Sequence, residues 1–427
     1  MSLPLELAIS AAKVVAVLLI ILNFVPVMIW MERKTAAYIQ DRRGPNRAGI
    51  LGIRLGGMIN SVADAIKLIT KEEFFPKGAN RFYFILAPFI VMFVYFITTA
   101  VIPLGDDLQI GDWTITLRIA DLNVGVLYIF SMASLAVYGV MLAGWSSNNK
   151  YSFLGGIRAS SQMISYELTL GLSVVSLFMM AGSVDLNDIV RNQGADVLSW
   201  NVLRQPLAFL LFLTASFAET NRTPFDLPEG ESELVAGYHV EYSSMKFALF
   251  MMGEYIAIIV ASAVIVSLFF GGWQVPFLTT QDLIDGVPDY LKLALTGFAA
   301  VSLLAGVFLV SRFRPSKYPP KYKDARRFEV LVLGIPAITA GLAVIALIPA
   351  YDPSLLPSWA GPVFAAAVQV ATFLTKVFFC CFFFIWVRWT LPRFRYDQLM
   401  SFGWKGMLPL SLANLAVTAI LMLRAAA

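Results

Sequence analysis

A concentration of acidic residues lies in the segment 219–246, inside an otherwise strongly apolar sequence. Six carboxylates stand there against two basic side chains and the only histidine, His239. Crowded carboxylates raise one another's pKa values, and partial burial acts in the same direction. Carboxylates with pKa values near neutrality can exchange protons with water or with a reduced substrate. The segment therefore indicates proton chemistry, with a solvated acidic loop as the structural alternative. The acidic residues are Glu219, Asp226, Glu229, Glu231, Glu233 and Glu241, and the basic ones are Arg222 and Lys246.

Three further ionisable residues, Glu167, Glu254 and Lys376, lie inside apolar windows. A charge at membrane depth is costly unless it is paired or hydrated, so each is a candidate functional residue. Glu167 and Glu254 have a structural alternative, because they could extend to the interface or bind a neighbouring arginine. Lys376, near the middle of its window, has little reach to either interface. Arg388 lies near a window's end and is expected to extend to the interface.

Residues that hold redox centres are scarce. Cys380 and Cys381 are the only cysteines, and they are adjacent. An iron–sulfur cluster needs several spaced thiolates, which this pair does not supply. One histidine cannot form a bis-histidine haem site. We therefore expect neither a metal site nor a redox centre in this chain.

The elements that must position these residues are transmembrane helices. Of 427 residues, 58% are hydrophobic and 14% charged, and the mean hydropathy is +0.73, outside the range of soluble domains. Apolar windows of about 20 residues recur, each long enough to cross a bilayer as a helix, and the alternating segments of a β-barrel are absent. The sequence predicts an all-α, polytopic bundle, one membrane domain over residues 1–427. About ten spans are expected, near 8–31, 82–103, 123–145, 162–182, 203–218, 247–270, 291–311, 329–350, 364–388 and 406–424.

Loop charges predict the orientation of the bundle. The stretch 32–81 is rich in Lys and Arg, and loops of the opposite parity carry aspartates with few bases. Basic loops favour the cytoplasm, so both termini are expected on the non-cytoplasmic side. The acidic segment 219–246 is anomalous, because parity places it inside. The net charge of +4 follows from topology, and no nucleic-acid partner is inferred. The first 30 residues are expected to form a retained span rather than a signal peptide.

The segment from Ile50 to Lys71 is too polar to cross a membrane but has helical periodicity. It predicts an amphipathic helix lying in the interface, or a helix packed on a partner subunit; the two can hold together. Its apolar face carries Leu51, Leu55, Met58, Ile59, Val62, Ile66 and Ile69, and its polar face carries Asn60, Asp64, Lys67 and Lys71.

Long contiguous motifs give the chain a resemblance to a known family. The run Ala-Glu-Thr-Asn-Arg-Thr-Pro-Phe-Asp-Leu-Pro-Glu, which begins at Ala218, continues through the acidic segment to Lys246. It resembles the signature of the H subunit of NADH:quinone oxidoreductase, the bacterial respiratory complex I, whose mitochondrial counterpart is subunit one. The resemblance covers residues 1 to about 270 and about 363 to the end. Supporting motifs are Glu32-Arg33-Lys34, Gln40 to Asn46, Gly144-Trp145, Asn149-Lys150-Tyr151, Ser165-Tyr166-Glu167, Trp386-Val387-Arg388 and Leu391 to Met400.

The sequence departs from the family pattern at two places. The region 275–362 exceeds the usual family length and supplies two extra spans, which makes eight core spans plus two inserted ones. Because two spans preserve parity, the flanking core keeps its orientation. In addition, Asn60-Ser61 stands where the family commonly has Gln-Pro, close to Asp64.

The resemblance implies a chamber that admits a membrane quinone as substrate, ubiquinone or menaquinone, and guides its head group toward an iron–sulfur cluster held by other subunits. Reduction of the quinone would then trigger proton pumping. The chamber residues implied by similarity are Arg43 and Asp64 near the mouth and Arg222, Asp226, Glu229, Glu231 and Glu233 along the wall. Glu167, Glu219 and Glu254 would form a carboxylate chain toward the pumping subunits.

The same resemblance implies a bacterial inner-membrane complex in which FMN and the iron–sulfur clusters belong to partner subunits. Expected partners are the quinone-site and terminal-cluster subunits, small membrane subunits, antiporter-like subunits and lipid. Two alternatives remain open. One is the ion-translocating membrane anchor of a related hydrogenase, which lacks a quinone substrate. The other is a stand-alone antiporter, which would show internal repeats.

Overall fold

The computed structural model describes residues 3–50, 53–111, 113–226, 237–313, 328–348 and 356–426. Within these ranges, nine helices are long and apolar enough to cross a membrane, which confirms the predicted all-α polytopic bundle. The shorter apolar helix α8 (Pro206–Glu219) occupies the place of the predicted span 203–218. The long helices are α1 (Leu3–Ile39), α3 (Arg81–Thr98), α4 (Gly125–Ser146), α5 (Lys150–Ala181), α10 (Ser244–Phe269), α12 (Val287–Ser311), α13 (Glu329–Leu347), α14 (Ala360–Thr390) and α16 (Leu408–Ala426), the last preceded by α15 (Tyr396–Ser401) and a π-helical turn (Phe402–Met407).

Short elements connect these helices. A two-stranded antiparallel hairpin, which the sequence did not predict, pairs Leu108 with Ile115. The short elements are α2 (Ile59–Thr70), α6 (Leu186–Gln193), α7 (Asn201–Arg204), α11 (Thr280–Asp285), β1 (Leu108–Ile110), β2 (Trp113–Ile115) and the 3₁₀ turns Leu55–Gly57, Thr99–Val101, Val197–Ser199 and Gly237–His239.

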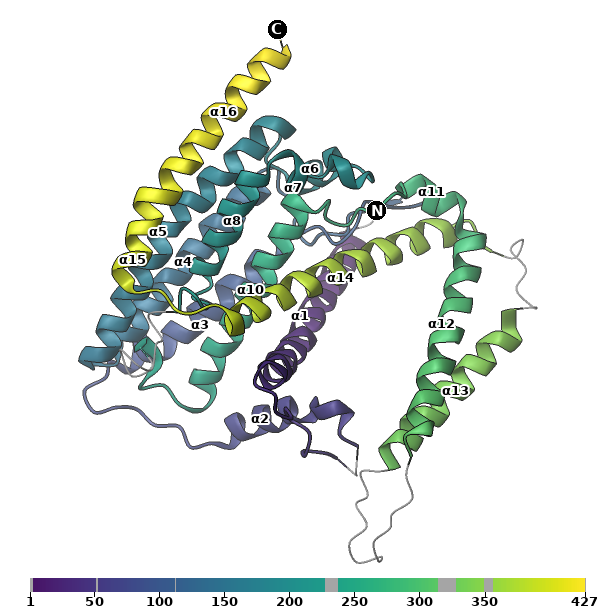
Figure 1. Ribbon diagram of the computed structural model, residues 1–427, viewed down its shortest axis with the longest axis horizontal. Helices are drawn as coiled ribbons and strands as arrows, with labels where there is room; N and C mark the ends of the chain where they lie inside the picture. The colour runs from purple at the N-terminus through teal and green to yellow at the C-terminus, as the bar shows by residue number, and fades with distance from the viewer. Residues whose placement is uncertain are drawn as a thin grey trace, which may run out of the picture.

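Helix α10 lies at the centre of the bundle. Two thirds (67%) of its span is buried, compared with 11% for α12 and for α13. It contacts α1, α3, α8 and α14. Helix α14 crosses α10 at a steep inclination (Figure 1). Residues from the middle of α14 therefore meet the end of α10, a contact that upright helices would not make.

Helices α12 and α13 form a pair that stands beside the bundle (Figure 1). They pack closely on each other through small residues, because a Cβ at Gly306 would lie 2.8 Å from the Gly334 carbonyl and one at Gly341 3.0 Å from the Ala299 carbonyl. Small residues let membrane helices approach in this way. At one end the pair contacts α11 and α14. These helices coincide with the two extra spans predicted within 275–362.

The amphipathic segment predicted near 50–71 forms α2, which lies at the end of the bundle opposite to both termini (Figure 1). The Ser61 hydroxyl donates to the Pro26 carbonyl of α1 (3.0 Å). Val62, Ile66 and Ile69 are exposed on the outer face. This apolar face suits an interface with lipid or a contact with a partner, as the sequence predicts.

Candidate functional site

Arg222 is placed by the end of α8. The helix ends at Glu219, and Asn221 adopts a left-handed conformation (φ 49°), which asparagine tolerates better than most residues. The Asn221 N–H donates to the Ala218 carbonyl (3.4 Å) and the Arg222 N–H to the Phe217 carbonyl (3.2 Å), the paired bonds of a Schellman motif. The chain therefore turns back and buries Arg222, of which 3% is exposed.

Gln162 of α5 holds the same turn from the other side. Its side-chain amide donates to the carbonyls of Ala218 (2.8 Å) and Phe225 (2.9 Å), and lies 3.1 Å from the Asn221 side-chain oxygen. Gln162 is fully buried. The helix end and the following loop are thus fixed to a neighbouring transmembrane helix.

Arg222 lies between two carboxylates that come from different helices. Its Nε is 2.7 Å from Glu254 Oε1 of α10, and its Nη1 is 3.5 Å from Glu32 Oε2 of α1. The Tyr255 hydroxyl donates to Glu32 Oε2 (2.8 Å), and the Tyr255 ring centre lies 4.7 Å from the Arg222 guanidinium carbon. Arg388 of α14 binds the other oxygen of Glu32. We call these five residues the charge cluster.

The charge cluster is balanced when both carboxylates are ionised, since two guanidiniums face two carboxylates. Burial of an unpaired charge is strongly unfavourable, whereas a paired and hydrogen-bonded set is tolerated. A proton added to Glu32 or Glu254 would leave one guanidinium uncompensated among four joined segments: α1, α10, α14 and the loop after α8. Protonation of either carboxylate would therefore weaken contacts that join these segments.

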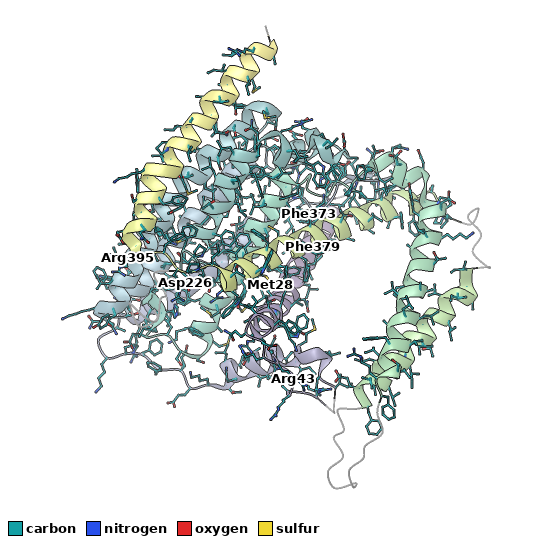
Figure 2. All side chains as sticks on the ribbon, viewed as in Figure 1. Met28, Arg43, Asp226, Phe373, Phe379 and Arg395 are labelled. Carbon is teal, nitrogen blue, oxygen red and sulfur yellow. The ribbon has the colours of Figure 1, made fainter. Side chains whose placement is uncertain are left out.

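The loop after Arg222 carries a second buried carboxylate, Asp226 (Figure 2). Arg393, just beyond α14, donates to Asp226 Oδ2 (2.9 Å). Burial raises the pKa of Asp226 above its ordinary value, although Arg393 and Arg222 act in the opposite direction. Burial also lowers the pKa of His239 to about 4, against an opposing effect of Asp226. His239 is therefore neutral at pH 7.

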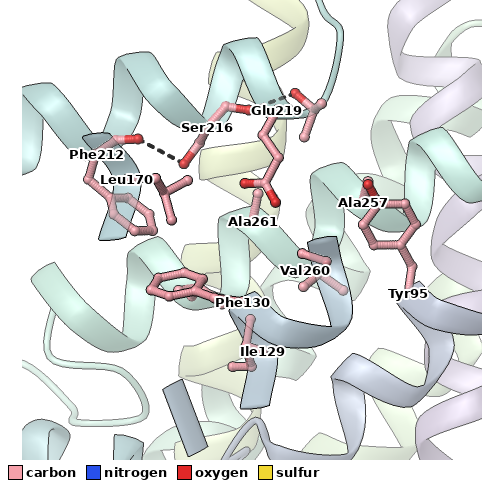
Figure 3. A pocket seen from close by; sticks show the side chains of 13 residues that line it. Tyr95, Ile129, Phe130, Leu170, Phe212, Ser216, Glu219, Ala257, Val260 and Ala261 are labelled. Atoms are coloured by element: carbon pink, nitrogen blue, oxygen red, sulfur yellow. Dashed lines mark hydrogen bonds between the residues drawn. The ribbon is translucent and has the colours of Figure 1, made fainter. Parts of the chain in front are cut away.

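Glu219 borders two small cavities. One, of about 30 Å³, lies between α4, α5, α8 and α10 and is lined by Phe130, Ser216 and Glu219 among others (Figure 3). The other, of about 20 Å³, is lined by both Glu219 and Glu254. Tyr95 lines both. A cavity that offers more than about 10–15 Å³ to a water-sized sphere has room for a water molecule. Glu254 and Glu219 are therefore separated by space that water can fill.

Glu167 continues this series on α5. Its carboxylate accepts a hydrogen bond from the Ser134 hydroxyl of α4, and Phe130, Ala133 and Leu170 beside this pair line the larger cavity. Glu167 also lies within electrostatic range of Glu219. The three carboxylates predicted as a chain are thus brought together, in the order Glu254, Glu219, Glu167.

Comparison with known proteins places this arrangement in a family. A family model described as NADH dehydrogenase matches residues 12–419. Relatives named as the H subunit of NADH-quinone oxidoreductase are 41% identical over 92% of this chain and 89% of the relative in Flavobacterium johnsoniae, and 40% identical over 98% of both chains in Cytophaga hutchinsonii. The relative from Solibacter usitatus is 40% identical over 97% of this chain and 96% of its own length. The chain belongs to the family of NADH-quinone oxidoreductase H subunits.

Coverage of this extent bears on the region 275–362. The alignments with the relatives from Cytophaga and Solibacter cover 98% and 97% of this chain. The aligned region therefore includes the α12–α13 pair.

Among the residues that the structure describes, no group of three or more His, Cys, Asp or Glu side chains is arranged to hold a metal ion.

The two residues predicted at the chamber mouth are not members of the charge cluster in this member of the H-subunit family. Arg43 is exposed in the loop after α1, at the α2 end of the molecule (Figure 2). Asp64 of α2 is paired with Arg33 of α1 (2.5 Å) and with Lys67 (3.2 Å). Asp64 therefore holds α2 to α1. Glu229, Glu231 and Glu233, predicted along the chamber wall, lie outside the described residues.

Two basic residues of α14, Arg388 and Lys376, bind partners on other segments. Arg388 was expected to extend to the interface, and its guanidinium binds Glu32, a partner that the sequence did not indicate. Lys376 instead donates to the carbonyls of Phe270 (2.9 Å), Gly272 (3.0 Å) and Gln274 (2.7 Å), just after the C-terminal end of α10. This contact gives Lys376 a structural role that the sequence did not indicate.

Sequence reasoning also missed members of the site. Glu32 stood in the motif Glu32-Arg33-Lys34 beside bases that topology explains, so it gave no separate signal. Tyr255 directly follows Glu254 in an apolar helix. Its role is visible only in the structure, where its hydroxyl donates to Glu32. Arg393 lay in the motif Leu391 to Met400, which indicated no carboxylate partner for it. A search for acidic residues flanking span ends, independent of loop charge, could have found Glu32.

Proposed function

We propose that this chain is the membrane subunit of a proton-pumping NADH-quinone oxidoreductase that admits quinone and begins the coupling of its reduction to proton movement. The observation that carries the proposal is the charge cluster, whose Glu254 shares a water-sized cavity with Glu219. The name that the relatives share, the H subunit of NADH-quinone oxidoreductase, supports the enzyme assignment.

The chemistry of the substrate explains why such a cluster is useful. Two-electron reduction of a quinone produces a dianion that takes up two protons. The loop that carries Arg222 and Asp226 joins the charge cluster to a buried carboxylate of raised pKa, so a nearby negative charge would disturb both. Along the proposed chamber wall, Arg222, Asp226, Glu229, Glu231 and Glu233 respond to the quinone, and Arg43 and Asp64 lie toward its mouth.

The response would pass along carboxylates. Glu254 is bound to Arg222, Glu219 lies across a cavity from it, and Glu167 follows beside the next cavity. Each step needs only a proton shared between a carboxylate and water. Glu167 is partly exposed, which suits a transfer to a neighbouring membrane subunit.

The remaining parts of the enzyme belong to other chains in this proposal. FMN and the iron–sulfur clusters would lie in partner subunits, and quinone would be a substrate rather than a bound cofactor. Partners would include the subunits of the quinone site, small membrane subunits and antiporter-like subunits. The chain would be a multi-pass protein of the bacterial inner membrane, with both termini on the non-cytoplasmic side.

A photoreactive quinone tests the chamber directly. In the intact membrane complex, the probe should label this chain within residues 40–65 or 219–246, and excess unlabelled quinone should suppress the labelling. Labelling confined to other subunits would remove the quinone role from this chain.

Replacement of Glu219 tests the carboxylate chain. Glu219→Gln keeps the shape of the side chain but cannot carry a proton, so NADH-driven quinone reduction with pumping should be lost while NADH oxidation by ferricyanide continues. Glu72→Gln, at an exposed acid after α2, is the matched control and should behave as the natural chain. Normal pumping by Glu219→Gln would exclude Glu219 from the pathway.

A further inference from the structure

Glu329 makes an unusual contact between the α12–α13 pair and the start of α2. This residue begins α13 and is buried, with 8% exposed. One of its oxygens accepts from the backbone N–H groups of Arg54 (3.0 Å) and Leu55 (2.6 Å), and the other accepts from the Arg54 guanidinium Nε (2.9 Å). Charge-assisted hydrogen bonds of this kind are among the stronger polar contacts in proteins.

The turn that Glu329 holds has an uncommon backbone. Leu55, Gly56 and Gly57 all have positive φ values, of 47°, 63° and 99°. Positive φ is unfavourable for leucine and persists where surrounding contacts impose it. A Cβ at Gly57 would lie 2.0 Å from the Pro45 carbonyl, so only glycine fits there. The polar contacts of Glu329 are therefore placed at a backbone that needs external support.

The same turn is also tied to α1 and leads directly into α2. The Trp30 ring N–H donates to the Gly56 carbonyl (3.1 Å), and Asp64 of α2 binds Arg33. The turn thus has one support from the bundle and one from the α12–α13 pair. Figure 1 shows α2 and the adjacent ends of α12 and α13 at the same end of the molecule.

The α12–α13 pair is suited to carry such a support. Its helices pack closely through Gly306, Gly334 and Gly341, and its opposite end contacts α11 and α14. The pair therefore connects the bundle at one end with the α2 turn at the other. Its own span is little buried, and Glu329 contacts the α2 turn at that end.

We propose that Glu329 is a positioning residue for the quinone: it holds the 54–57 turn, and hence the start of α2, in the place that admits a long-chain quinone from the bilayer. This rests on the proposed function only in that α2 must border the chamber mouth. A short, soluble quinone that reaches the chamber without threading an isoprenoid tail past α2 should depend much less on Glu329.

The first measurement concerns the turn itself. Leu55→Cys, at a side chain 45% exposed, is introduced into the intact complex with Cys380 and Cys381 replaced by serine, and its rate of reaction with a maleimide is measured. Glu329→Ala should accelerate labelling, and Glu329→Gln should do so less, because its amide oxygen still accepts a backbone N–H. Asp289→Ala, at an exposed acid near the other end of the pair, is the control and should leave the rate unchanged.

The second measurement concerns the quinone. Glu329→Ala should raise the KM for a long-chain quinone about tenfold, with kcat, the KM for a short-chain quinone and ferricyanide-linked NADH oxidation unchanged. An unchanged labelling rate would overturn the inference, and so would faster labelling with a normal long-chain KM. Either result would leave the proposed chamber standing, because the photoreactive quinone tests that separately.

Discussion

Removal of one charge from the charge cluster should be costly, and removal of an opposite charge beside it should add less than its own single loss. Glu32→Gln keeps the shape of the side chain and an oxygen that can accept from Tyr255, but it removes the negative charge. Arg222 would then retain Glu254 as its carboxylate, and Arg388 would lose the only carboxylate that pairs with it among the described residues. The perturbation is therefore electrostatic rather than steric.

The size of the effect follows from burial. Breaking a buried ion pair by removing one partner costs about 3–5 kcal/mol. The Glu32 side chain is 10% exposed but that of Arg388 is 26% exposed, so solvent screens part of the loss. We expect Glu32→Gln to lower the free energy of unfolding by about 2–4 kcal/mol and Arg388→Gln by about 1–2 kcal/mol, because Glu32 would keep Arg222 and Tyr255.

The double variant separates pairing from packing. With Glu32→Gln and Arg388→Gln together the cluster is again neutral, so the loss should be smaller than the sum of the single losses by at least about 1 kcal/mol. Unfolding of the purified chain by SDS in mixed micelles measures all three variants. Additive losses would refute the view that the two residues act as a buried pair, and a Glu32→Gln variant of normal stability would refute the electrostatic reasoning altogether.

Two further predictions follow from groups outside the cluster. Lys376→Met should lower the free energy of unfolding by about 2–4 kcal/mol, since three carbonyls lose a charged donor, while quinone reduction per assembled complex stays normal; lost pumping at normal stability would instead make Lys376 functional. His239 has a pKa lowered to about 4, so the unfolded chain takes up a proton below about pH 6.5 before the folded chain does, and stability should fall by up to about 3 kcal/mol between pH 6.5 and 4. His239→Gln should flatten this part of the pH dependence of the unfolding midpoint, and an unchanged slope would show that other groups cause it.

The sequence predicted the membrane helices well because each one must satisfy its own backbone hydrogen bonds in lipid. Length and hydropathy therefore suffice to locate α1 or α10, and amphipathic periodicity suffices for α2. The β1–β2 hairpin has only three residues in each strand, and the π-helical turn before α16 lies against α5, so neither carries a comparable signal.

Side-chain partners were harder to predict, since they depend on how the helices incline. Arg388 and Lys376 both lie on α14, whose steep crossing of α10 turns one toward Glu32 and the other toward the residues after α10. A pattern of hydropathy gives the length of such a helix but not its tilt. For this reason the sequence identified charged residues that are costly to bury, but it did not identify the partners that compensate their charge.

The carboxylates of the acidic segment 219–246 contact residues of neighbouring elements. Topology alone makes its negative charges anomalous, and a solvated loop was one explanation. In the described part of the segment, however, Asp226 binds Arg393, Glu241 accepts from Asn149 (2.6 Å) and Glu219 borders two cavities. Protonation of carboxylates that are tied to basic or amide groups of neighbouring elements weakens those contacts. Their location thus favours a coupling role over simple solvation, and this is a physical reason to expect that proton uptake here is felt by α5, α10 and α14 together.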